Sequence, residues 1–197
     1  MELERYPLIR RLLVVAILGV IVALFVQREM LSKDSTGGTD GTTALGMLTA
    51  NTPEIGSLAP DFTVENRDGT LRLSDFRGQS VILNFWASWC APCLEEMLEF
   101  QQLHEQRAPA GDLTIIAMNF AAGDSRSAAL EFIDTVGITF TIAFDTDDGA
   151  VADRYGVIGL PATFFIDRDG VLRLLRYGPV IGDDLAEGVA TADAGAS

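Results

Sequence analysis

The chain is poor in side chains that hold metal ions or build disulfide frameworks. Its 197 residues include two cysteines, Cys90 and Cys93, and one histidine, His104. A structural zinc site takes about four ligands, so these three residues fall short of one. A purely structural bridge between the two cysteines would close a very short loop, which contributes little to stability. Metal binding and structural cross-linking are therefore poor explanations of the pair.

Basic residues are also scarce. Lys and Arg together number 14 against 28 Asp and Glu, which gives a formal net charge of −14 and a pI near 4.3. A chain with this charge repels the phosphates of nucleic acids, so we expect no nucleic-acid partner. Much of the acidity is spread over predicted loops and helix faces, where it favours solubility.

Only one long apolar run occurs, at residues 12–26. It is short for a membrane span of about 17–25 residues, but arginines on both sides can reach the membrane interfaces. We expect an uncleaved anchor in residues 1–31, with a transmembrane helix at about 8–28. A cleaved signal peptide is an alternative, although the run does not end in the small residues of a cleavage site. A buried helix of the domain is another.

The residues on either side of this run predict its orientation in a membrane. Arg5, Arg10 and Arg11 precede the run, whereas the basic residues after it stand beside acidic ones. This bias predicts that the N-terminus lies inside and the rest of the chain outside, in an oxidising compartment. We expect a flexible linker at 32–55, rich in Ser, Thr and Gly, then a domain at 56–190 and a disordered tail at 191–197.

Within the domain, apolar patterns alternate between strand-like and helix-like spacing. Residues 62–64 and 71–73 flank the turn signal Asp68-Gly69 and predict a hairpin. Later segments predict helices at 92–107, 126–136, 149–155 and 183–190, and strands at 81–87, 113–120, 140–144, 162–166 and 171–175. Strands that alternate with helices and end in a hairpin indicate an α/β sandwich with a mixed sheet.

The cysteines stand where a buried strand gives way to a helix. Residues 81–87 are apolar apart from Asn84, and the helix begins near Pro92, a residue that the first helical turn tolerates. Unpaired amides and the helix dipole at such a junction favour a thiolate on Cys90. Cys93 lies close enough to release a mixed disulfide formed by Cys90. The residues themselves therefore predict a dithiol/disulfide oxidoreductase.

The sequence resembles the thioredoxin superfamily, specifically the membrane-anchored TlpA/ResA/CcmG-like disulfide reductases of bacteria. Four stretches carry the resemblance: 56–62, 71–78, 81–93 and 155–167. It implies a thioredoxin-like three-layer sandwich with a mixed central sheet, an N-terminal hairpin and an extra helix-strand insertion, preceded by a single transmembrane helix. A peroxiredoxin-type cysteine motif is not found, so direct peroxide reduction is not expected.

The resemblance also implies roles for residues around the dithiol. Cys90 is the expected nucleophile and Cys93 the resolving thiol, with Ala91 and Pro92 setting the geometry and the reduction potential between them. Pro161 is expected to form a cis peptide bond near the sulfurs. Few X–Pro bonds in folded proteins are cis, but the resemblance implies one at this position.

Four further residues complete the expected site. The backbone of Leu160 is expected to pair with an extended substrate chain, and Trp89 to lie on the rim of the site. Asn84 stands where ordinary thioredoxins have a buried aspartate. Glu96 matches a glutamate that tunes thiol pKa values in ResA-like proteins. Its alternative role is only to interact favourably with the dipole at the start of the helix.

The implied partners come from the same resemblance. They are disulfide-containing protein clients, among them the Cys-x-x-Cys-His motif of apocytochrome c, and a membrane electron donor of the CcdA/DsbD type. The resemblance implies no cofactor beyond the Cys90–Cys93 disulfide and no metal. It places the protein in the bacterial cytoplasmic membrane as a single-pass protein, with its catalytic domain in the periplasm.

Two other functions stay open. A copper-delivery or copper-site assembly factor would use the same cysteines, but the chain lacks a cluster of His or Met beside them. A disulfide-forming oxidase would run the same exchange in reverse. A reduction potential near the roughly −270 mV of thioredoxin indicates a reductase, and one near the roughly −120 mV of DsbA indicates an oxidase.

Overall fold

The computed structural model describes residues 52–195 of the chain. The predicted membrane anchor and nearly all of the predicted linker lie outside the described residues. Among the helices that the structure does describe, each is too short or too polar to cross a membrane.

A seven-stranded mixed sheet forms the centre of the domain, in the order β2-β1-β5-β4-β3-β6-β7. Its middle strands β3, β4 and β5 are parallel, while β1 and β6 join them in the antiparallel sense. The bounds are β1 Thr63–Asn66, β2 Thr70–Arg72, β3 Ser80–Trp86, β4 Leu113–Asn119, β5 Thr141–Phe144, β6 Ala162–Ile166 and β7 Leu172–Tyr177.

The expected N-terminal hairpin and terminal hairpin are both present. Strands β1 and β2 pair across the predicted turn, and β6 pairs with β7 across the second one. Strand β3 is buried at every position, including Ser80 and Asn84, as its mostly apolar sequence predicts for a strand covered on both faces.

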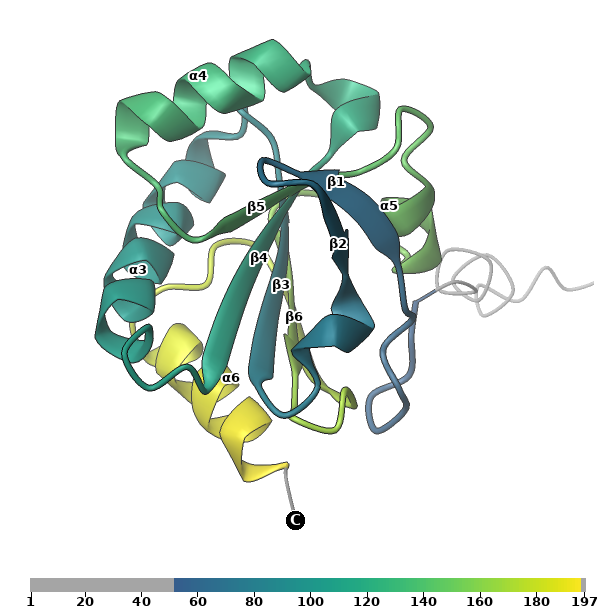
Figure 1. Cartoon of the computed structure of the whole chain (residues 1–197), viewed down its shortest axis with the longest axis vertical. Helices are drawn as coiled ribbons and strands as arrows, with labels where there is room; N and C mark the ends of the chain where they lie inside the picture. Colours follow the sequence, from purple (N-terminus) through teal and green to yellow (C-terminus); the bar gives the residue numbers. More distant parts are fainter. Residues whose placement is uncertain (1–51, 196–197) are drawn as a thin grey trace, which may run out of the picture. The chain divides into compact units, whose positions relative to one another are not determined.

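Helices cover both faces of the sheet, which gives three layers (Figure 1). One apolar cluster joins the sheet to α3, α4 and α6, and the other joins it to α5 and the short helix η2. The helices span α3 Ala91–Arg107, α4 Arg126–Val136, α5 Ala150–Arg154 and α6 Asp183–Ala194, with 3-10 turns η2 Leu73–Phe76 and η3 Ala121–Gly123. The thioredoxin-like sandwich is thus confirmed.

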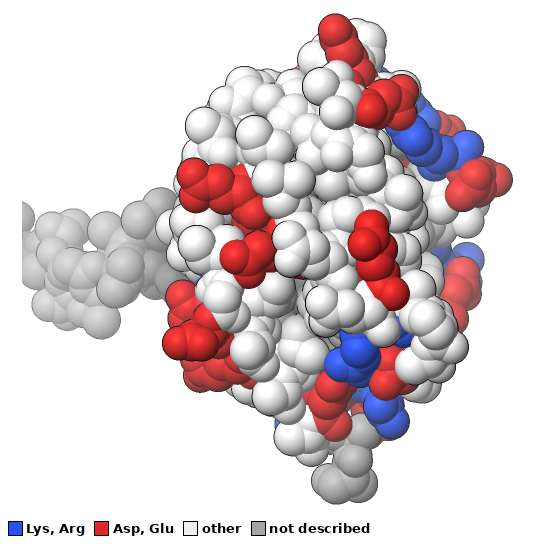
Figure 2. Space-filling model, turned by 90° about the vertical axis from the view of Figure 1, so that its left-hand side faces the viewer, with Lys and Arg blue, Asp and Glu red and all other residues white. Residues whose placement is uncertain are grey.

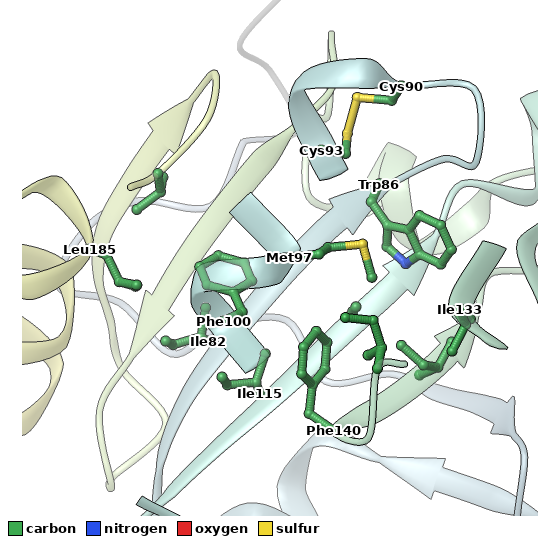
Figure 3. Close-up of a cluster of buried hydrophobic side chains, with 14 of the residues drawn as sticks. Ile82, Trp86, Cys90, Cys93, Met97, Phe100, Ile115, Ile133, Phe140 and Leu185 are labelled. Carbon is green, nitrogen blue, oxygen red and sulfur yellow. A yellow bond between two sulfur atoms is a disulfide. The ribbon is translucent and has the colours of Figure 1, made fainter. Parts of the chain in front are cut away.

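The first cluster lies directly beneath the cysteines. Figure 3 shows Met97 and Phe100 of α3 lying among Ile82 and Ile115 of the sheet, with the cysteines at one end of the cluster. Positions 93, 96, 97 and 100 of α3 are all buried, which is the spacing of a single helix face. Burial of this face fixes the direction of α3 and therefore the position of its first turn.

The expected extra helix and strand are α4 and β5. The Ser125 hydroxyl caps α4 by accepting the Ala128 N–H at 3.2 Å, and Gly137 ends the helix in the left-handed conformation. These local signals place both ends of α4 where the sequence predicts them.

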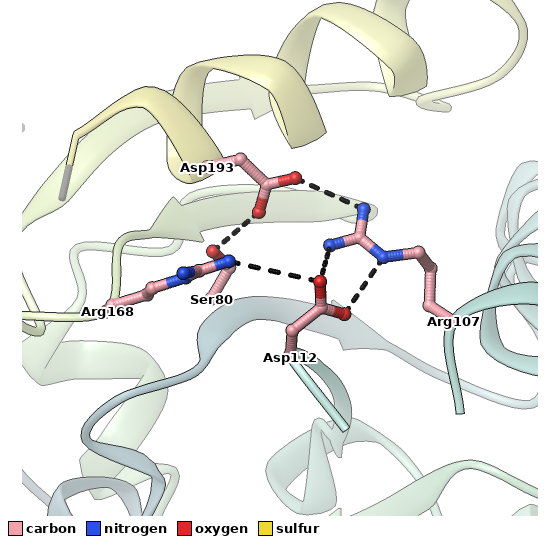
Figure 4. Close-up of polar contacts among 5 residues, drawn as sticks. All are labelled: Ser80, Arg107, Asp112, Arg168 and Asp193. Atoms are coloured by element: carbon pink, nitrogen blue, oxygen red, sulfur yellow. Dashed lines mark hydrogen bonds and ion pairs between the residues drawn. The ribbon is translucent and has the colours of Figure 1, made fainter. Parts of the chain in front are cut away.

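The terminal helix was expected to end near Ala190 and to be followed by disorder, and this is wrong for residues 191–194, which are helical. Helix α6 continues to Ala194 because its last turn has partners: Ala192 is fully buried, and Asp193 accepts hydrogen bonds from Ser80 and Arg107. Figure 4 shows this polar network, in which Arg107 also makes a two-point contact with Asp112. Gly188 brings α6 against the ring of Phe165, where a Cβ atom would collide.

Candidate active site

The two cysteines form a disulfide at the start of α3. Cys90 is the N-cap residue of the helix, and Cys93 lies inside its first turn, with 5.3 Å between the two Cα atoms. Cys90 is 5% exposed and Cys93 is fully buried. Both cysteines are therefore buried, and Cys90, at the start of the helix, is the more exposed of the two.

Helix α3 gives this position its electrostatic character. The seven residues of β3 lead into the Ala87–Trp89 segment, and Ala91 and Pro92 occupy the first turn with exposed side chains. The first amides of a helix have no partner within it, and α3 is 17 residues long. Their N–H groups and the helix dipole favour negative charge at Cys90.

The proline expected to face the dithiol is in the cis form, with the bond between Leu160 and Pro161. Ala162, the next residue, pairs with Phe85 in the β3–β6 ladder, so Pro161 falls beside the end of β3 that leads to Cys90. Pro161 is buried and Leu160 is half-buried. Within the described residues, the Leu160 backbone makes no hydrogen bond, whereas the Pro161 carbonyl accepts one from Gly178.

Behind Cys93 lies a buried polar cluster of Glu96, Asn84 and Thr163. Glu96 is fully buried on the same face of α3 as Cys93. One oxygen of its carboxyl group, Oε1, accepts hydrogen bonds from the Thr163 hydroxyl at 2.6 Å and the Asn84 amide at 3.1 Å. Asn84 and Thr163 are register partners on β3 and β6, and Asn84 also donates to the Thr163 hydroxyl at 3.0 Å.

The environment of Glu96 favours its neutral form. Burial raises the pKa of Glu96 to about 8, against the opposing effect of hydrogen bonds from Thr163, Asn84 and the Val180 backbone. A carboxyl group with this pKa can hold or release a proton near neutral pH. Such a group next to a dithiol is suited to proton exchange with a thiol.

A second polar group lies on the opposite side of the cysteine loop, and the sequence did not single it out. The Asp124 carboxylate accepts the Ser88 N–H at 2.6 Å, the Ser88 hydroxyl at 2.7 Å and the Asn119 amide at 2.9 Å. The Trp89 indole N–H donates to the Gly123 carbonyl at 2.6 Å. Trp89, next to Cys90 in the chain, is 62% exposed, whereas Trp86 is fully buried in the core.

The sequence analysis singled out the cysteines, Pro161 and Glu96, but it did not single out Thr163 and Asp124. Thr163 follows Pro161 by two residues and carries the polar group of an otherwise apolar strand, which is a usable signal. Asp124 directly precedes the N-cap Ser125, so it has the appearance of a residue of the helix start. The contacts of Thr163 with Glu96 and of Asp124 with Ser88 can be known only when the order of the strands is known.

This fold and this disulfide define a class, the thioredoxin-fold proteins with a cysteine pair at the first turn of a helix. Within that class the chain belongs to the AhpC/TSA family, whose model matches residues 55–175. It is 37% identical over 134 residues to the thiol-disulfide oxidoreductase ResA of Geobacillus thermodenitrificans, covering 68% of this chain and 75% of ResA.

Two further comparisons agree. The thioredoxin-like protein YneN of Bacillus subtilis is 35% identical, with 67% of this chain and 76% of YneN covered. A crystal structure of a DsbE-type thiol:disulfide interchange protein from Chlorobium tepidum superposes with a TM-score of 0.65 at 34% identity, covering 72% of this chain and 99% of the other. The protein is therefore a thioredoxin-like thiol-disulfide oxidoreductase of the ResA/DsbE type.

Proposed function

We propose that this protein reduces disulfide bonds in other proteins, with Cys90 as the attacking thiol and Cys93 as the resolving thiol. The observation that carries the proposal is the position of the Cys90–Cys93 pair: the more exposed cysteine stands at the N-cap of a 17-residue helix, and its partner lies fully buried in the first turn. A thiolate is the reactive species in exchange, and this position favours one.

The exchange runs in two steps. The Cys90 thiolate attacks one sulfur of a client disulfide, so a bond forms between Cys90 and the client while the second client sulfur leaves as a thiolate and takes up a proton. The Cys93 thiol then loses its proton and attacks Cys90. The bond between Cys90 and the first client sulfur breaks, and that sulfur leaves as a thiolate and takes up a proton. The Cys90–Cys93 disulfide is formed, so two electrons have passed to the client.

The proton released by Cys93 needs an acceptor inside the domain, since Cys93 has no exposed surface. The ionised form of Glu96 is suited to that task, because it lies three residues further along the same buried helix face. Burial raises its pKa to about 8, so this carboxylate takes up a proton more readily than an ordinary one. This favours a role in proton transfer over the simple helix-dipole role that was the alternative.

The client chain is proposed to lie along Leu160 and Trp89. The Leu160 N–H and C=O are available for a short strand-like pairing with an extended segment, and the exposed indole of Trp89 offers an apolar wall. Ala91 and Pro92 keep their proposed role in setting the geometry between the two sulfurs.

The proposed cellular setting is the periplasmic side of the bacterial cytoplasmic membrane, with an N-terminal anchor within residues 1–31. The arginines before the apolar run support this orientation. The names of the relatives, a thiol-disulfide oxidoreductase and a thiol:disulfide interchange protein, support protein disulfides as the substrate class. Within that class we propose clients of the apocytochrome c kind, and electrons from a CcdA/DsbD-type membrane protein.

A trapping experiment tests the chemistry and the clients together. In the Cys93→Ala variant the mixed disulfide cannot be resolved, so clients should stay attached to Cys90 and be released by reductant. Mass spectrometry of the captured proteins should identify exported proteins with cysteine pairs. Cys90→Ala is the matched control and should capture none. Capture by Cys90→Ala and not by Cys93→Ala would reverse the two roles.

A further inference from the structure

The segment that carries Cys90 is tied to the segment after the neighbouring strand. Strands β3 and β4 end side by side, and the Phe120 N–H donates to the Trp86 carbonyl just beyond the ladder at 2.9 Å. The chain then continues from β3 toward Cys90 and from β4 into η3. Two consecutive residues of the first segment, Ser88 and Trp89, bond to two consecutive residues of the second, Gly123 and Asp124. We call these four residues the loop clamp.

Asp124 is the central acceptor of the loop clamp. Its two carboxylate oxygens receive both donors of Ser88, the backbone N–H and the hydroxyl, and Asn119 adds a third hydrogen bond. Partial burial on its own would raise the pKa of Asp124, but hydrogen bonds from Ser88, Asn119 and the Ser125 backbone outweigh it and lower the pKa. The carboxylate is therefore ionised at neutral pH, and bonds to an ionised acceptor are stronger than neutral ones.

Capping of α4 does not account for this arrangement. The hydroxyl of Ser125 already fills the N-cap role by accepting the Ala128 N–H. The side chain of Asp124 contacts the loop before Cys90, 36 residues away in sequence.

The indole of Trp89 is held by the same clamp. Its N–H donates to the Gly123 carbonyl, and its ring packs over Gly123, where an added Cβ would lie 3.7 Å from the indole and 3.3 Å from the Phe120 ring. The indole is therefore within contact distance of Gly123, and the tighter contact of an added Cβ would be with Phe120. Trp89 remains 62% exposed, so the clamp presents one face of a fixed indole next to the reactive sulfur.

We propose that Asp124 is a positioning residue for thiol-disulfide exchange, which acts through Ser88 and Trp89 to hold Cys90 at the N-terminus of α3 and to fix the indole that a client contacts. The inference rests on the proposed role of Cys90 as the attacking thiol. Small losses of alignment cost rate because the reacting sulfurs must lie in line. The loop clamp supplies this alignment from a neighbouring element.

The test compares three variants of the full chain. Asp124→Asn replaces one acceptor oxygen with a donor that faces the donors of Ser88. Ser88→Ala removes the hydroxyl but keeps the charge of Asp124. Asp61→Asn is the matched control, because Asp61 accepts the N–H and hydroxyl of Ser74 at 3.0 Å and 2.8 Å in the same pattern, next to the β1–β2 hairpin at the edge of the sheet.

We expect Asp124→Asn to lower the second-order rate constant for reduction of insulin disulfides about 10-fold, and Ser88→Ala to lower it about 3-fold. Both changes should go in the same direction, although only one of them removes a charge. Time-resolved fluorescence anisotropy should gain a fast component from a freed Trp89. Asp61→Asn should lose about as much thermal stability as Asp124→Asn, while keeping the exchange rate and the anisotropy of the wild type.

Two outcomes overturn the inference: an Asp124→Asn variant that is less stable but has unchanged rate and anisotropy, or an Asp61→Asn control that slows the exchange equally. Peptide mapping of the first cysteine to be alkylated in the reduced protein separates failure of this inference from failure of the proposed function. If Cys93 is alkylated first, the assignment of Cys90 is wrong, and the anisotropy of Trp89 still decides whether Asp124 holds the loop.

Discussion

Glu96 is a carboxyl group buried between a helix and two strands, directly behind a cysteine pair. Two neighbouring side chains, Asn84 and Thr163, donate hydrogen bonds to it, yet burial dominates and raises its pKa to about 8. The cost of keeping such a group charged in the interior is what makes its proton exchangeable at the pH where thiols react. The cluster therefore lowers the stability of the fold where Glu96 is charged, and it provides an exchangeable proton behind the cysteines.

This pKa has a consequence for the stability of the oxidised protein. The folded state releases the Glu96 proton near pH 8 and the unfolded state near 4.5, so the group favours folding below pH 4.5 and this contribution is lost as the pH rises toward 8. The free energy of unfolding of Glu96→Gln, measured relative to wild type, should therefore increase by about 2–3 kcal/mol when the pH is raised from 5.5 to 8.

Urea unfolding of the oxidised proteins at both pH values measures this difference. The neighbouring Glu95, which is exposed on the same helix, gives a control variant, Glu95→Gln, that should show no such trend. A constant gap between Glu96→Gln and wild type at both pH values would mean that Glu96 does not titrate in this range.

Among the elements, α3 and α6 have different tasks. Helix α3 carries the cysteines and Glu96 on one buried face, while α6 closes the same side of the sheet through its apolar residues and its last turn. The polar network of Ser80, Arg107, Asp112, Arg168 and Asp193 (Figure 4) lies at the start of β3, whereas the cysteines come after its end. The polar network that holds α6 and the redox site therefore lie at opposite ends of β3.

Asp193→Ala should therefore weaken the fold without changing the exchange reaction. Loss of its two half-buried contacts, to Arg107 at 3.1 Å and to the Ser80 hydroxyl at 2.8 Å, should cost about 1–2 kcal/mol. Asp184→Ala, in the exposed first turn of the same helix, should change stability by less than about 0.5 kcal/mol. Chemical denaturation and the rate of insulin reduction are the two measurements. A slowed reaction in Asp193→Ala would show that the two ends of β3 are coupled.

The molecule as a whole is strongly acidic, with a formal net charge of −14. Six of its described arginines are in ion pairs with carboxylates, so the positive charge is largely neutralised locally. On the face shown in Figure 2, basic side chains lie at the upper right and in the lower part of the view, and acidic ones are scattered among uncharged residues. The field of the domain therefore attracts cationic partners.

Exchange rates should depend on salt in opposite directions for partners of opposite charge. Raising the salt from about 10 mM to about 300 mM should slow the reaction with a lysine-rich protein disulfide several-fold, because screening removes the attraction. The same change should speed the reaction with the anionic disulfide 5,5′-dithiobis(2-nitrobenzoate). Stopped-flow measurements with the reduced protein would show this, and identical salt dependence for both substrates would contradict it.

The amino-acid sequence determined those features of the protein that depend on neighbours along the chain. Apolar periodicity and capping residues such as Ser125 and Gly137 placed the helices and strands, and the spacing of Cys90 and Cys93 after a buried strand placed the dithiol at a helix start. Family resemblance added the cis bond at Pro161. Each of these depends on interactions within a few residues, or on a motif that can be compared directly.

The tertiary structure alone decided which distant side chains meet. Three hydrogen bonds join residues far apart in the sequence. Thr163 donates to Glu96 over a separation of 67 residues, Ser88 to Asp124 over 36, and Ser80 to Asp193 over 113. Strand order brings these pairs together, and a local pattern contains no information about which strand ends become neighbours. For the same reason the last turn of α6 was expected to be disordered, since its stability comes from contacts with β3 and α3 that only the folded chain provides.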